Sequence, residues 1–129
     1  MARTAIPITA TSGSAFVSEP SYTSVTTVAD GASVTPGANQ LNDVLLFLKY
    51  SCSGSSASVA SIAAGDNPPA WGAGLGDIVI AASGSAANAV SVISLCDSYR
   101  TTQDTGLIHV EFDSDVVTSA SAYALSMPK

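Results

Sequence analysis

The stretch Val44–Tyr50, VLLFLKY, is the strongest apolar run of the chain and follows directly on Asn42-Asp43. Its length and continuity fit either a strand buried on both faces or a helix of two turns. The flanking residues are rich in Ser and Gly and supply no helix caps, which favours the strand. We therefore expect a buried strand here, with the rest of the fold built around it.

Alternating segments on both sides of this run predict further strands. Turn-forming residues such as Asp30-Gly31 and Asp104-Thr105-Gly106 separate them. The expected segments are Arg3–Thr9, Ser14–Val17, Tyr22–Ala29, Ser33–Thr35, Ala57–Ala63, Asp77–Ala82, Ala89–Leu95, Leu107–Phe112 and Val116–Met127. No amphipathic helix of convincing length is present. The pattern predicts an all-β fold, a single β-sandwich or jelly-roll-like domain of about eight antiparallel strands.

The N-terminal segment stands apart because Pro7 cannot donate a hydrogen bond to a β-ladder. We expect residues 1–12 to form an extended arm or an edge strand, and residues 13–129 to form the sandwich. No internal repeat, linker or compositional break divides the chain further. If the segment is a contact arm, its removal should leave the melting temperature of the domain nearly unchanged.

Charge is sparse in this sequence. Of 129 residues, 4 are Lys or Arg and 10 are Asp or Glu, for a net charge of -6, against roughly a quarter of charged residues in an average domain. Such a surface suits a protein that is largely covered in its working state, since interface cores are depleted in charge. The alternative is an environment that tolerates a surface of Ser, Thr, Ala and Gly.

The same charge balance argues against several partners. The basic residues do not cluster as phosphate binding requires, so nucleic acid and anionic membranes are not expected partners. They are Arg3, Lys49, Arg100 and Lys129. No run approaches the ~20 apolar residues of a membrane span. The N-terminus, MARTAIPITA, lacks the apolar stretch of a signal peptide, so we expect folding in a cytoplasm.

We find no catalytic pattern and predict no catalytic residue, no cofactor-binding residue and no enzyme activity. His109 is the only histidine, and in LIHVEF it alternates with Ile108, Val110 and Phe112, which predicts that it faces away from the core. No GxSxG elbow is present. The glycine-rich AWGAGLGD has no neighbouring lysine and precedes a β-rich segment, so it predicts a structural loop rather than a phosphate site.

Two minor possibilities remain open from the residues. Glu111, Asp113 and Asp115 alternate, and on one strand face they could hold Ca²⁺, although a solvated turn is the commoner arrangement and we predict no metal site. Cys52 and Cys96 are either buried small side chains or a disulfide between neighbouring strands.

Several motifs resemble a family of small virion proteins of tailed bacteriophages. They are GDNPPAWGAGLGD (65–77), SLCDSYRTTQDTGLIHVEF (94–112), the closing Ala122-Tyr123-Ala124-Leu125 and the opening Arg3-Thr4-Ala5-Ile6-Pro7. The chain departs from the family pattern where Ser98-Tyr99-Arg100 replaces Ala-Arg-Phe and where Asp104-Thr105-Gly106 replaces Asp-Gly. The resemblance does not extend over residues 11–60.

This resemblance implies a capsid decoration (cement) protein that binds the major capsid protein on the outside of the phage head, after assembly in the bacterial cytoplasm. It also implies a homo-oligomer, with a trimer favoured. The alternatives are another virion component, such as a connector, tail or fibre protein, or a glycan- or receptor-binding module. We expect the contact residues to be Arg3, Ile6, Pro7, Ile8, Trp71, Tyr99 and Arg100; Trp71 could equally cap the core.

Overall fold

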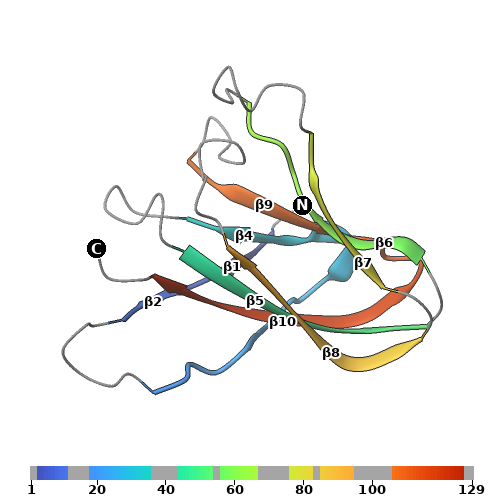
Figure 1. Ribbon diagram of the computed structural model, residues 1–129, viewed down its shortest axis with the longest axis horizontal. Coiled ribbons are helices and arrows are strands. Elements are labelled where there is room, and N and C mark those ends of the chain that lie inside the picture. Colours follow the sequence, from blue (N-terminus) through green and yellow to red (C-terminus); the bar gives the residue numbers. More distant parts are fainter. Residues whose placement is uncertain are drawn as a thin grey trace.

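The structure is a computed structural model that describes residues 3–11, 18–35, 44–53, 56–66, 76–82, 85–94 and 106–126. These residues form ten strands and one short 3-10 helix, arranged as two facing sheets (Figure 1). The elements are β1 (Thr4–Ile6), β2 (Ile8–Ala10), β3 (Thr23–Ser24), η1 (Val28–Asp30), β4 (Ala32–Val34), β5 (Val44–Cys52), β6 (Ser56–Ile62), β7 (Ile78–Ala82), β8 (Ala86–Ser94), β9 (Ile108–Phe112) and β10 (Val117–Ser126). Among the described residues, no helix is long and apolar enough to span a bilayer.

Strands β3 to β10 pair as the two halves of one long antiparallel ribbon. At its tip β6 pairs with β7, followed by β5 with β8, β4 with β9, and β3 with β10. Rolling up this ribbon adds two further antiparallel pairings, β5 with β10 and β6 with β9. The resulting strand orders, β3-β10-β5-β8 and β4-β9-β6-β7, are those of a jelly roll. The prediction of an all-β sandwich of the jelly-roll kind is confirmed.

We name the two layers after their central strands. The β5 sheet contains β2, β3, β10, β5 and β8, and the β9 sheet contains β1, β4, β9, β6 and β7. The core lies between them. On β5, alternate residues from Val44 to Cys52 are buried and face the β9 sheet, whereas the residues between them are only half buried. The expected burial of this strand on both faces is therefore complete on one face and partial on the other.

The β9 sheet supplies the opposing half of the core. Its inward side chains are branched aliphatic residues with almost no exposed surface, among them Val34, Ile62, Ile108 and Val110. Opposite them, β10 presents the small side chains of Ala120, Ala122 and Ala124. Small residues across from large ones let the two layers approach closely without leaving voids.

The segment Tyr22–Ala29, expected to be one strand, is broken. Only Thr23–Ser24 pair with β10, as β3, and Val28–Asp30 form η1. Between them the Val25 amide donates to the Ala120 carbonyl at 2.9 Å and the Val25 side chain enters the core. The chain crosses here from the β5 sheet to the β9 sheet, and this crossing ends the strand despite its β-branched composition.

The N-terminal residues pair with both sheets and hold them together at one side. β1 runs parallel to β4 in the β9 sheet, and β2 runs parallel to β10 in the β5 sheet. Pro7 lies between β1 and β2, where the chain changes sheets, and Ile6 is buried in the core with 3% of its surface exposed. Deletion of this segment is therefore expected to lower the melting temperature, contrary to the expectation for a detached arm.

Gly31 is required by the close approach of the chain to β9. Its φ of +74° with ψ of -165° is a conformation open essentially to glycine alone. A Cβ at this position would collide with the Val110 carbonyl oxygen and would lie 2.7 Å from Nη1 of Arg3. The Asp30-Gly31 turn that the sequence predicts thus also sets the spacing between η1 and β9.

We predict that Gly31→Ala destabilises the domain far more than Gly76→Ala. Gly76 also has a positive φ, +67°, but nothing lies within 4 Å of an added Cβ. Gly76→Ala should therefore lower the free energy of unfolding only by the cost of the left-handed backbone conformation, about 1–3 kcal/mol. Gly31→Ala has this cost and a collision with the backbone as well. Chemical denaturation of both variants measures the difference, and equal losses would contradict this account of Gly31.

Candidate functional site

The two outer faces of the sandwich differ in chemistry. The outer face of the β9 sheet is largely polar: it carries Ser33, Ser61, His109 and Glu111, with the exposed Val79 of β7 opposite Ser61 at its edge. As predicted, His109 and Glu111 alternate with the buried Ile108 and Val110 and point away from the core. This is the usual pattern of an antiparallel sheet with one face in water.

Arg3 joins the N-terminus to this polar face. Its guanidinium forms an ion pair with the Glu111 carboxylate and donates a hydrogen bond to the Asp30 carbonyl oxygen at 3.3 Å. Both side chains remain partly exposed, so the pair contributes little to stability on its own. Its contacts are intramolecular, and in this conformation the charge of Arg3 is already partnered.

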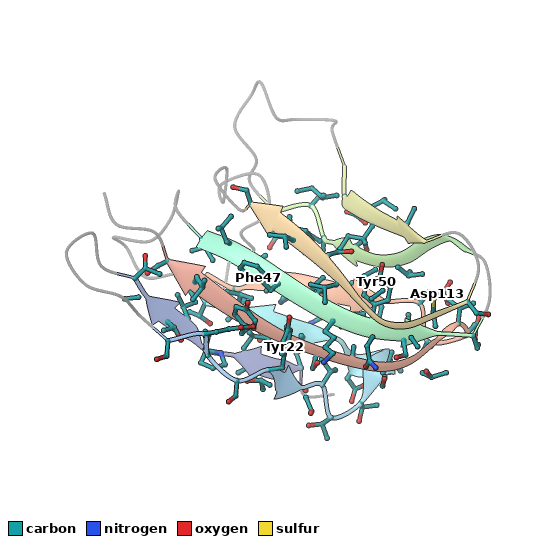
Figure 2. The ribbon with its side chains drawn as sticks, turned by 60° about the horizontal axis from the view of Figure 1, so that its bottom comes forward. Tyr22, Phe47, Tyr50 and Asp113 are labelled. Atoms are coloured by element: carbon teal, nitrogen blue, oxygen red, sulfur yellow. The ribbon has the colours of Figure 1, made fainter. Side chains whose placement is uncertain are left out.

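The middle of the outer face of the β5 sheet is apolar, and Thr9, Ser94 and Ser121 lie on the same face beside it. It is formed by β5, β8 and β10 together with the residue before β3, and Figure 2 brings it toward the viewer with Tyr22 and Phe47 labelled. We call this surface the apolar face; its residues are Tyr22, Leu45, Phe47, Lys49, Val90, Val92, Tyr123 and Leu125. An antiparallel sheet face of this composition departs from the polar-outward pattern.

Three aromatic rings stabilise the centre of the apolar face. The Phe47 and Tyr123 rings are stacked, with centroids 4.6 Å apart, and the Tyr22 ring meets Tyr123 edge-on at 4.7 Å. The Lys49 ammonium lies 5.2 Å from the Tyr22 ring centroid, within cation–π range. Tyr123 is thereby buried although it points away from the core.

The two valines of the apolar face lie on β8, the last strand in the order of the β5 sheet. Val90 and Val92 of β8 are 52% and 54% exposed, and they stand opposite Lys49 and Phe47 of β5. Val79 of β7, at 56%, is the other exposed large hydrophobic residue in the described part of the chain. All three lie on β7 and β8, the strands at one side of the sandwich.

Two open hollows lie on the described surface. One of about 200 Å³ is lined by residues of β5, β8 and β10 including Lys49, Asn88 and Ser121. Another of about 230 Å³ lies beside Ser61 and Glu111. Both are smaller than the roughly 300–1,000 Å³ typical of small-molecule sites. A broad face, rather than a cleft, is therefore the main candidate for function.

The acidic residues considered as Ca²⁺ ligands make separate contacts within the protein. Glu111 pairs with Arg3, and the Asp113 carboxylate accepts the Asp115 amide at 3.1 Å within a turn over residues 114–116. Because β9 ends at Phe112, the alternation that would align the three carboxylates stops before Asp113. Within the described ranges, no three His, Cys, Asp or Glu side chains are grouped to hold a metal ion.

The predicted contact residues have different positions. Ile6 is in the core, Ile8 is half buried and packs against it, and Pro7 is exposed. Trp71, Tyr99, Arg100 and Cys96 lie outside the described residues, as does the segment Ser14–Val17, so those predictions stay open; Cys52 is buried.

Sequence reasoning missed the apolar face. The alternation in AVSVISL (89–95) does not decide by itself which set of residues points inward. In the structure the inward set is Ala89, Ser91 and Ile93, and the two valines point outward. The signal that could have revealed this is the apolar character of both residue parities in VLLFLKY, which implies that the neighbouring strands also have two covered faces.

Comparison of the chain with protein-family models, with curated proteins and with solved structures gave no match.

We predict that Tyr123 makes the stability of the domain sensitive to alkaline pH. Burial, followed by its hydrogen bond to Glu19 and the charge of that carboxylate, raises the pKa of Tyr123 to about 12. Because the unfolded phenol ionises near pH 10, the contribution of Tyr123 is complete below pH 10 and is lost as the pH rises toward 12.

In thermal melts followed by circular dichroism, the melting temperature of the wild type should fall more steeply above pH 10 than that of Tyr123→Phe. At neutral pH the variant should lose about 0.5–1.5 kcal/mol from the missing hydrogen bond. Parallel curves for the two proteins at alkaline pH would contradict the assignment.

Proposed function

We propose that the protein is a virion structural protein, a capsid decoration (cement) protein that binds the outer surface of a phage head and stabilises it by bridging subunits of the major capsid protein. The observation that carries this proposal is the apolar face. It is a sheet face with three packed aromatic rings and two half-exposed valines; Lys49 lies on it, and the Glu19 carboxylate accepts the hydrogen bond of Tyr123.

Such a face is costly to leave in water. Burial of apolar surface stabilises by about 25 cal/mol per Å², and monomeric proteins rarely keep large contiguous apolar patches exposed. Aromatic residues are enriched and charged residues depleted at the centres of protein interfaces. The composition of the apolar face therefore supports a large, flat protein partner rather than a small ligand.

The jelly roll supports this function but does not decide it, because the same fold serves capsid proteins, lectins and cupins. The low charge of the whole chain, 14 charged residues in 129, and the resemblance of its motifs to small phage virion proteins point in the same direction. A protein that binds the assembled shell but not free coat subunits shifts the equilibrium toward the shell by mass action.

We predict that the purified protein binds empty shells that lack it and raises their melting temperature. Leu45→Glu should abolish or weaken binding at least about tenfold, because it places an unpaired charge within the apolar face. His109→Glu introduces the same residue on the polar face and should bind as the wild type does. Sedimentation of shells with labelled protein and calorimetry of the shells measure both effects.

If the wild type neither sediments with shells nor changes their melting temperature, the proposal fails. If Leu45→Glu and His109→Glu lost binding to the shells equally, the apolar face would not be the contact surface. Binding to a glycan array, without binding to shells, would favour the receptor-binding alternative.

A further inference from the structure

The two sides of the sandwich differ in how their sheet edges end. At one side the edges are β1, β2 and β3, which have three, three and two residues. Pro7 lies between β1 and β2, and Pro20 lies three residues before β3. At the other side the edges are β7, with five residues, and β8, with nine. Within the described residues, β8 is thus the longest strand with a neighbour on one side only.

Natural edge strands are usually protected from pairing by charged residues, by proline or by bulges. β8, AANAVSVIS, contains no charged residue and no proline. Its irregularity is confined to its start, where the register with β5 shifts and Asn88 has a φ of +53°. From Ala89 to Ile93 the strand is regular, and Val90 and Val92 expose more than half of their surface.

Charge permits a second copy of this chain as the occupant of this edge. Two copies that each carry a net charge of -6 repel one another, so their contact is least costly along a neutral strip. β8 forms such a strip, since it contains no ionisable side chain.

Strand length and symmetry point to the same occupant. An antiparallel edge is self-complementary under a two-fold axis. Each of the other sheet edges in the described residues has five residues or fewer, so β8 finds an edge of matching length in a second β8.

We propose that the protein forms a two-fold dimer in which β8 pairs antiparallel with β8 of a second copy, centred on Ser91. This register places Val90 opposite Val92 of the second copy, and Ala89 opposite its Ile93. The four valines then lie together on one face of a continuous sheet, as apolar cross-strand pairs. The apolar faces of both copies become one surface.

This symmetry replaces the trimer expected from the sequence. A three-fold assembly needs a contact between two different surfaces, whereas β8 offers the same strand on both sides of the axis. The inference does not depend on the proposed role in a phage head, because it concerns the isolated chain in solution.

The first test is the mass of the protein in solution. Sedimentation equilibrium of the wild type should give twice the chain mass of 12.8 kDa. Val92→Lys should weaken the dimer at least about tenfold, because it places two like charges at diagonal positions about 7–8 Å apart across the contact, and should still melt cooperatively since Val92 is 54% exposed. Val79→Lys is the matched control, because Val79 is 56% exposed on β7; it should stay dimeric.

The second test is the register, in a chain whose Cys96 is replaced by serine. Cysteines at directly opposed positions lie close enough to form a disulfide, whereas diagonal positions about 7–8 Å apart do not. Under mild oxidation Val90→Cys and Val92→Cys should each stay uncrosslinked alone and should form a covalent dimer when mixed.

A monomer, a trimer or aggregates of no fixed mass in the wild type would overturn the proposal. So would a Val92→Lys protein that remains as dimeric as the wild type. Crosslinking of either single variant with itself would overturn the register centred on Ser91.

Discussion

The ladder between β5 and β10 is the pairing on which the rest of the structure depends. It aligns nine register pairs from Val117 with Cys52 to Ser126 with Val44, with one irregularity near its start. Through this ladder the most apolar strand of the chain is set beside a strand of alanines and serines. The large side chains of β5 and of the β9 sheet can then meet over the small ones of β10, which closes the core.

The same ladder determines the two unlike sides of the β5 sheet. Because Phe47 and Tyr123 occupy opposed positions, their rings stack on the outer side, and Tyr22 and Glu19 complete the burial of Tyr123. An ordered aromatic cluster on the outside of a sandwich provides a rigid platform, since the rings are already held by one another before any partner arrives. Such preorganisation lowers the entropic cost of binding.

Sequence reasoning located most strands because the spacing of apolar residues and turns is a local signal. It placed β5 at VLLFLKY, although the strand continues to Cys52, and it oriented His109 correctly. It did not foresee the break after Ser24, which is caused by the crossing between sheets. Nor did it foresee that β1 pairs parallel with β4 and that β2 pairs parallel with β10. These features depend on contacts between residues that are distant in the chain, and the local alternation of apolar residues carries no information about such contacts.

The candidate site was harder to predict than the fold for the same reason. Whether Val90 faces the core or the outside depends on which face of β8 meets the side chains of the β9 sheet. Both sets of alternate residues in AVSVISL contain apolar side chains, so the sequence does not show which set is buried. Ile6 was expected at a contact and is in the core because β1 joins β4 rather than extending outward.

The parallel pairing of β2 with β10 has a consequence for synthesis on the ribosome. Residues 8–10 leave the exit tunnel long before their partners at 124–126. The β5 sheet therefore cannot be completed before β10 has been made, and until then Ile8 lacks its strand partner. Nascent chains that have not yet reached β10 should accordingly offer no finished β5 sheet to a neighbour, which delays any association through this sheet.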